Sequence, residues 1–204
     1  MFNPNQVTTL LDLMGCEPTP RRLPVEPIAR HADLSDDHQY RWTLQRRWGA
    51  GPSVCWFMLN PSVADERRDD PTLRRVMRFT DAWGYRSAVV VNLYPYRSSL
   101  PSSMMAWRAG NGIEPDWALA ENRRRASLVL APCELMIAAY GVLEGRQIDD
   151  LKLWIGSIAP KRKWRCLGTT AEGWPKHPMA RGQHWVPDGT EAQPYDPLRP
   201  EVPA

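Results

Sequence analysis

The sequence predicts a three-layer α/β/α protein, in which helices cover both faces of a central, four-stranded, mostly parallel sheet. Two observations indicate this. Several short segments are continuously apolar, which is typical of strands covered on both faces. Helix-like segments separate them, giving the order strand, helix, strand, helix, strand, helix, strand. That alternation is typical of a parallel sheet.

The expected elements follow one another along the chain. Residues 40–48 have mixed polarity, which predicts an exposed N-terminal strand outside the four-stranded sheet. The four buried strands are expected at residues 53–59, 87–93, 134–141 and 163–170. Helices are expected at residues 70–83, 115–130 and 146–159, with a long loop between residues 94 and 114. Pro71 favours the start of the first helix and Gly84 its end.

The chain has 204 residues, which fits one domain with tails. Residues 1–37 are rich in proline and are expected to be irregular, apart from a short helix over residues 5–14. Residues 38–184 are expected to form the single α/β domain. Residues 185–204 are again rich in proline, which predicts an extended or disordered tail.

Composition limits the classes of function. The formal net charge of +3 does not by itself indicate a nucleic-acid-binding protein, but the basic residues are clustered and create local positive fields. The four cysteines form no C-x-x-C pair, so we expect no metal and no cofactor. Cys55, Cys133 and Cys166 fit reduced thiols in the core. We expect a cytoplasmic protein without a membrane partner, since no signal peptide and no membrane-length apolar run is visible, and we assume a monomer.

Polar residues follow the predicted strands. Right-handed connections place the ends of parallel strands at one edge of the sheet, where ligands of open α/β folds bind. The residues expected at that edge are Asn60, Pro61, Ser62, Asp65, Asn92, Tyr94, Tyr96, Arg97, Ser98, Tyr140, Gly141, Gly168, Thr169, Thr170 and His177. Such a set can hydrogen-bond to a planar polar ligand and stack on it. Taken singly, each also fits a structural role, since an asparagine before a proline is common in turns.

Several sequence blocks together resemble a bacterial and phage domain family of unknown function. They are "WFMLNPSVAD", "DDPTLRR", "VVVNLYPYRS", "AAYG" and "LGTTAEGWPKHPMA", and the resemblance covers roughly residues 38–180. No G-x-G-x-x-G, Walker lysine or G-x-S-x-G motif is present, which disfavours dinucleotide, P-loop and α/β-hydrolase sites.

The same succession is distantly similar to the uracil-DNA glycosylase superfamily. This resemblance implies a glycosylase-like fold and an N-glycosidase that acts on a base, possibly modified, in DNA or in a nucleotide. By position, Asn60 matches the motif that holds the attacking water, Asn92 the base-reading asparagine, and His177 the late His-Pro segment. The chain differs from the glycosylase pattern at Met58 and Ser62, which replace glycines, and at Met179, which replaces a serine.

The chemistry of an N-glycosidase suggests a role for each residue. His177 would donate a hydrogen bond to the leaving base, Asn60 would orient the water, and Asp65 would be the stronger base if it turns inward. Base-binding residues would be Asn92, which reads the base edge, Tyr94 or Tyr96, which stack on the base, and Ser62. The arginines expected to bind phosphates are Arg67, Arg68, Arg74, Arg75 and Arg97.

Two other classes of function remain open at this point. Asp65, Glu66, Asp69 and Asp70 could together hold Mg²⁺ in a phosphoryl-transfer enzyme or nuclease. Asp69 and Asp70 also fit the start of a helix, where they would cap it and interact with its dipole, and this interpretation is favoured. A non-catalytic module that binds a nucleotide or nucleic acid is the third alternative.

Overall fold

The computed structural model describes residues 25–110, 113–159 and 162–198, which contain a seven-stranded mixed sheet. The strand order is β1-β2-β4-β3-β5-β6-β7. The strands are β1 (Ala29–Leu34), β2 (Arg41–Arg47), β3 (Ser53–Met58), β4 (Ser87–Asn92), β5 (Cys133–Ala138), β6 (Trp164–Cys166) and β7 (Gln193–Pro194). The helix expected over residues 5–14 lies outside the described residues.

Four adjacent strands are parallel, as the sequence predicts. β4 and β5 flank β3, with Val54 opposite Ala88 on one side and Phe57 opposite Ala138 on the other, and β6 follows β5. The predicted total of four strands is nevertheless wrong, because three antiparallel strands extend this parallel core: β1 and β2 beyond β4, and β7 beyond β6. β1 belongs to the segment predicted to be irregular, and β7 to the predicted tail.

β2 is largely buried, contrary to the expected exposed strand. β1 and β4 cover its two edges, and Trp42 and Leu44 are buried in the core. Helix α3 (Ile113–Leu130) packs against it, and the Arg125 guanidinium lies 5.3 Å from the Trp42 ring centre. Two of the three charged residues of β2, Arg41 and Arg46, are therefore buried, and only Arg47 at the end of the strand is exposed.

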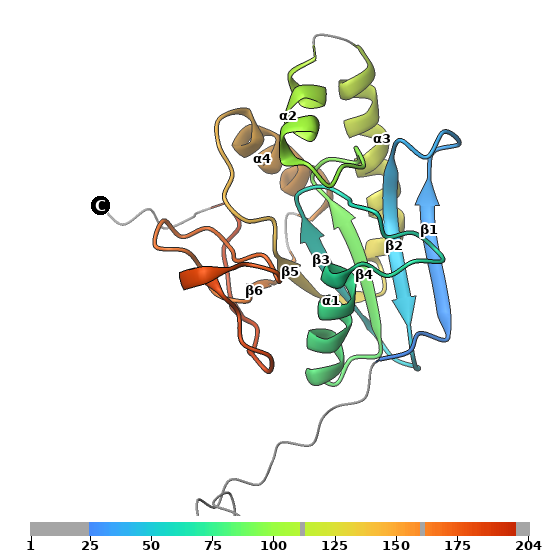
Figure 1. Ribbon diagram of the computed structural model, residues 1–204, viewed down its shortest axis with the longest axis vertical. Coiled ribbons are helices and arrows are strands. Elements are labelled where there is room, and N and C mark those ends of the chain that lie inside the picture. The colour runs from blue at the N-terminus through green and yellow to red at the C-terminus, as the bar shows by residue number, and fades with distance from the viewer. Residues whose placement is uncertain (1–24, 111–112, 160–161, 199–204) are drawn as a thin grey trace, which may run out of the picture.

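The helices form a layer on each face of the sheet (Figure 1). α1 (Pro71–Ala82) packs on one face, where Leu73, Val76 and Phe79 join a core with Trp56. The other face is covered by α3, by α4 (Arg146–Ile158), and by α2 (Pro101–Ala109), which forms within the predicted long loop. This arrangement confirms the predicted α/β class with helices on both faces.

The start of α1 is fixed by its sequence. Pro71 occupies the first turn, where its missing N–H costs nothing, and the Asp70 carboxylate accepts a hydrogen bond from the backbone N–H of Leu73 at 2.8 Å. Gly84 follows the helix with a positive φ of 86°, a conformation that favours glycine. Asp70 therefore fixes where the β3–α1 loop ends, and Gly84 lies just beyond the other end of the helix.

Cys55, Cys133 and Cys166 are buried free thiols, as expected. Every helix within the described parts of the chain is too short or too polar to cross a membrane.

Candidate functional site

A cavity of about 300 Å³ lies at the carboxyl ends of β3 and β4, beside the start of α1. Its wall includes Asn60, Ser62, Asn92 and His177, which come from three segments far apart in the sequence. The backbone positions the two strand ends, because the N–H groups of Leu93 and Tyr94 donate to carbonyls of residues 58 and 59. Four of the residues predicted for the site therefore meet at one cavity.

The side-chain amide of Asn60 is held in one orientation. Its Nδ2 atom donates to the carbonyl oxygens of Pro61, at 3.1 Å, and of Ser98, at 2.9 Å. The carbonyl oxygen Oδ1 is therefore the part of the amide left to accept a hydrogen bond from a ligand or water.

Asn92 is buried, and its side-chain amide is held through the oxygen, whereas that of Asn60 is held through the nitrogen. Its Oδ1 atom accepts a hydrogen bond from Nη2 of Arg41 at 3.2 Å, so the two N–H donors of Nδ2 remain for a ligand. Arg41 uses one of the two lone pairs of this oxygen, so the reading of a base by a paired donor and acceptor stays a prediction. Asn92 contributes donors to the cavity.

His177 presents a neutral ring to the cavity. The backbone N–H of Met179 donates to its Nδ1 atom at 3.0 Å, which places the ring proton on Nε2. Burial lowers the pKa of His177 to about 4, and the attraction of Asp70 only partly opposes this. The imidazole is therefore uncharged at neutral pH and can act as a donor through Nε2.

The carboxylate at the cavity belongs to Asp70 and not to Asp65. Asp70 lines the cavity while it caps α1. The Oδ1 atom of Asp65 accepts hydrogen bonds from the backbone N–H groups of Arg67 and Arg68, at 2.9 and 2.8 Å, within its own turn. Burial raises the pKa of Asp65, but these two hydrogen bonds outweigh it and lower the pKa overall. Asp65 does not line the cavity, so the structure does not place it where a catalytic base is needed.

The two tyrosines predicted to stack on a base also lie away from the cavity. Tyr94 is fully buried in the core on the opposite face, and its hydroxyl donates to Asp150 at 2.9 Å. The ring of Tyr96 stacks on Trp107, with ring centres 5.3 Å apart. Both rings are engaged in packing, so neither is available as predicted.

A groove of about 860 Å³ lies around the start of α1, on the side away from Asn92. Arg67, Arg68 and Arg74 line it, as expected of phosphate-binding residues, together with Arg30 and Arg78. Met179, two residues after His177, also lines the groove, so the groove and the cavity adjoin at this loop. This places exposed arginines beside the mouth of the cavity.

Two of the predicted phosphate-binding arginines serve the fold. Arg75 also borders the groove but is buried, and its guanidinium donates to the carbonyl of Val186 and lies 3.5 Å from Asp188. Arg97 does not border the groove and donates to the carbonyls of His38 and Val63. These contacts hold backbone segments together, which is a structural role.

The acidic residues that could have formed a magnesium site each interact with different partners. The Asp69 carboxylate pairs with Arg30 at 2.7 Å and with Arg46 at 2.8 Å, while Asp65 and Asp70 accept backbone hydrogen bonds. Across the described ranges, no group of three or more His, Cys, Asp or Glu side chains could hold a metal ion.

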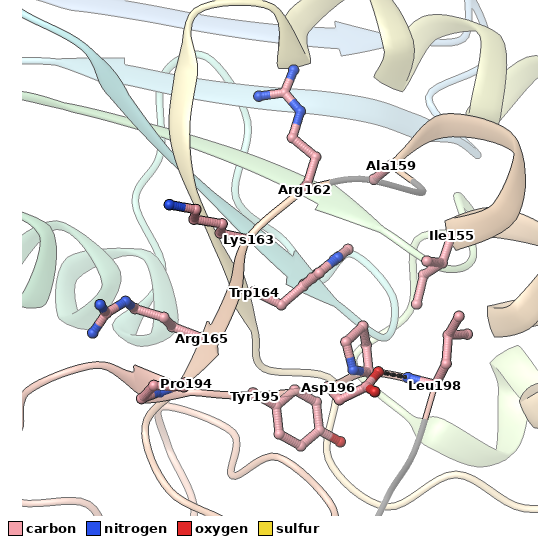
Figure 2. Close-up of a pocket in the computed structure, with 11 residues that line it drawn as sticks. Ile155, Ala159, Arg162, Lys163, Trp164, Arg165, Pro194, Tyr195, Asp196 and Leu198 are labelled. Carbon is pink, nitrogen blue, oxygen red and sulfur yellow. Dashed lines mark hydrogen bonds between the residues drawn. The ribbon is translucent and has the colours of Figure 1, made fainter.

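Another hollow, of about 620 Å³, lies where β6 meets β7. Figure 2 shows that the Arg162 side chain points in a different direction from those of Lys163 and Arg165, which both extend to the left. The Arg162 guanidinium donates to the carbonyls of Cys133 and Leu130. Because its polar groups do not converge, this hollow is a weaker candidate for a site than the cavity at Asn92.

Ser98, which was expected at the sheet edge, also lines the cavity, as do Arg41 and Ser99, for which no site role was predicted. The hydroxyl oxygens of Ser99 and Ser62 are 2.9 Å apart. Ser99 directly follows Ser98 in the sequence, so its nearness to the other strand-end residues could have indicated it. Arg41 offered no such indication, because an arginine at the start of a strand usually faces solvent.

Comparison with known proteins identifies a family but no characterised relative. A family model described as a protein of unknown function, DUF1643, matches residues 41–179, from the start of β2 to just beyond His177. No curated protein and no solved structure matches the chain. The matched range covers well over half of the sequence and contains most of the residues that line the cavity. The chain therefore belongs to the DUF1643 family of proteins of unknown function.

Proposed function

We propose that this protein is an N-glycosidase, similar in fold and site to uracil-DNA glycosylases, that releases a base from DNA or from a nucleotide. The observation that carries the proposal is the set of hydrogen-bonding groups at one cavity. His177 and Asn92 supply donors, and Asn60 supplies an acceptor. These are the three residues that the glycosylase resemblance singles out.

The chemistry needs this combination of groups. Breaking an N-glycosidic bond leaves negative charge on the base and positive charge on the sugar. Donors at fixed positions stabilise the charge on the base without having to reorganise during the reaction. The Nε2–H of His177 and the Nδ2 donors of Asn92 take this role. A neutral imidazole donor is suited to it, because it does not have to give up its proton to the base.

The attacking water needs acceptors. The Oδ1 atom of Asn60 orients the water but is too weak a base to deprotonate it. The Asp70 carboxylate lines the same cavity and replaces Asp65 as the candidate for accepting the water's proton. The groove arginines Arg67, Arg68 and Arg74 would hold the phosphates of the substrate.

Base release from a panel of substrates tests the proposal. The panel contains uracil- and modified-base oligonucleotides, single-stranded and duplex, together with the mononucleotides, each with and without a chelator. We expect chelator-resistant release that falls about 10²- to 10³-fold in His177→Ala, the usual cost of removing one preorganised donor. Release should also fall in Asn60→Ala, because the attacking water loses the acceptor that orients it. The matched control is His31→Ala, because His31 is exposed and does not line the cavity.

Three results would count against the proposal. Release that His177→Ala leaves unchanged would remove the donor role of His177. Chelator-sensitive cleavage of the sugar-phosphate backbone would indicate a nuclease instead. Tight binding of the panel without turnover would indicate a binding module.

A further inference from the structure

Two arginines of β2 are buried, but only one of them has an acidic partner. Arg46 is fully buried, and its Nε donates to the Asp69 carboxylate at 2.8 Å. Arg41 is 4% exposed, and none of the described carboxylates lies within ion-pair distance of its guanidinium. A buried charge is normally paired, so Arg41 is the exception that needs an explanation.

Several N–H donors of the Arg41 guanidinium have no acceptor among the described residues. Of its five N–H groups, one on Nη1 donates to the carbonyl of Ala64 at 2.9 Å and one on Nη2 to Asn92 Oδ1 at 3.2 Å. Its Nε is buried without a partner. The pKa of Arg41 falls to about 10, because burial outweighs the attraction of Asp70, and the side chain is still a cation at neutral pH.

The unpaired cation lines the cavity at Asn92, where the neighbouring groups are mostly donors. The Nδ2 of Asn92 and the Nε2 of His177 are donors, and the hydroxyls of Ser62 and Ser99 can donate as well. The Asp70 carboxylate is also at the cavity and attracts Arg41, but the two do not form an ion pair. On the side of the cavity formed by Arg41 and Asn92, no described carboxylate therefore pairs with the guanidinium.

We propose that Arg41 binds an anionic oxygen group of the ligand in this cavity. The planar guanidinium suits a flat, two-oxygen acceptor better than an ammonium group would. The anionic oxygen could belong to a phosphate or to a planar ring that carries negative charge on oxygen. This inference stands on the burial and contacts of Arg41, and it holds whether or not the protein cleaves a glycosidic bond.

Direct binding to the full-length chain tests the inference. The probes are inorganic phosphate, barbiturate, which is a planar ring anion at neutral pH, and uracil, a neutral ring of similar shape. We expect calorimetry to detect binding of phosphate or barbiturate that is at least tenfold tighter than binding of uracil. Preference for phosphate would identify a phosphate group as the ligand's anion, and preference for barbiturate would identify the ring.

Substitutions then assign the binding to Arg41. Arg41→Gln should weaken binding of the preferred anion at least tenfold. Arg97→Gln is the matched control, because Arg97 also has a buried Nε without a partner but does not line the cavity, and it should bind the anion like the unmodified chain.

A second variant keeps the test independent of how well Arg41→Gln folds. Asn92→Asp would put a carboxylate oxygen where Asn92 Oδ1 now accepts from Arg41, and so supply the missing negative charge from within the protein. We expect this variant to melt at a higher temperature and to lose at least tenfold in affinity for the anion. The inference would be overturned by equal affinity for the anions and uracil, by absence of binding, or by anion binding that Arg41→Gln or Asn92→Asp leaves intact.

Discussion

The backbone N–H of Met179 donates to Nδ1 of His177 at 3.0 Å, and this hydrogen bond decides what His177 can do. It occupies one ring nitrogen as an acceptor and leaves Nε2–H as the donor. Protonation of Nδ1 would break the bond and place a charge in a buried position. The low pKa of the ring, about 4, is consistent with that cost, which comes mainly from burial.

The stability of the protein should depend on pH through His177. Its pKa is about 4 in the folded chain and near the ordinary value of 6.5 when unfolded, so the unfolded state binds more protons between these values. The contribution of neutral His177 is therefore fully present above pH 6.5 and is lost as the pH falls toward 4. Melting temperatures measured across this range should fall less steeply for His177→Gln than for the unmodified chain.

The exposed His31 provides the comparison for this pH series. His31→Gln should follow the curve of the unmodified chain, because no buried ring is removed. Parallel curves for His177→Gln and the unmodified chain would mean that His177 titrates normally in the folded state.

Asp70 has two roles that substitutions can separate. Asp70→Asn keeps an oxygen that can accept from the N–H of Leu73, whereas Asp70→Ala removes the cap and should lower the free energy of unfolding by about 1 kcal/mol. If Asp70 takes the proton of the attacking water, Asp70→Asn should retain most of the stability but lose about 10²- to 10⁴-fold in the rate of base release. Urea unfolding and base release, measured on the same samples, give both quantities.

Asp65→Asn is the control for Asp70. The Asp65 carboxylate only holds its own turn through the N–H groups of Arg67 and Arg68. An amide oxygen can accept the same bonds, so base release should change less than twofold. A large loss of activity in Asp65→Asn together with normal activity in Asp70→Asn would restore Asp65 as the base.

The fold was predictable where the pattern of side chains reflects burial on both faces. β3 and β4 are apolar runs that are fully buried, and the Asp70-Pro71 pair marks the start of α1. β1 was missed because its sequence, ARHADL, places polar and charged residues among a few apolar ones and follows a proline-rich segment. β2 was expected to be exposed because arginines usually face solvent, whereas Arg41 and Arg46 are buried through hydrogen bonds that a sequence does not reveal.

The site was predictable only where a residue ends a strand. Asn60 and Asn92 reach the same cavity because β3 and β4 are parallel neighbours. Tyr94 was placed wrongly because it lies beyond the end of β4. There the direction of a side chain depends on the path of the loop and no longer on the alternation of the strand. The role of Arg41 depends on which residues surround it after folding, and the spacing of residues along the chain does not predict these neighbours.

Arg75 should matter for stability and not for binding phosphates. Its buried guanidinium donates to Val186, lies near Asp188 and sits 5.3 Å from the ring centre of Phe79. Arg75→Ala would leave the carbonyl of Val186 without its donor, which should cost about 1–3 kcal/mol in the free energy of unfolding. The exposed neighbour Arg74 is the comparison, and Arg74→Ala should change stability by less than about 0.5 kcal/mol. Equal urea midpoints for the two variants would contradict the structural role of Arg75.

The exposed arginines of the groove should determine how nucleic-acid binding depends on salt. Arg67 and Arg68 border the groove, and neither donates a side-chain hydrogen bond to another described residue. Each phosphate contact on a single strand contributes about 0.7 to the slope of log affinity against log salt concentration. The double variant Arg67→Gln/Arg68→Gln should therefore bind a single-stranded oligonucleotide more weakly at low salt, with a slope reduced by about 1.4. Arg124→Gln removes an exposed arginine of α3 that pairs with Glu121 and does not line the groove, and it should leave the slope unchanged. Fluorescence anisotropy over a series of salt concentrations measures the slope, and identical slopes for all three proteins would show that the groove does not bind the phosphates.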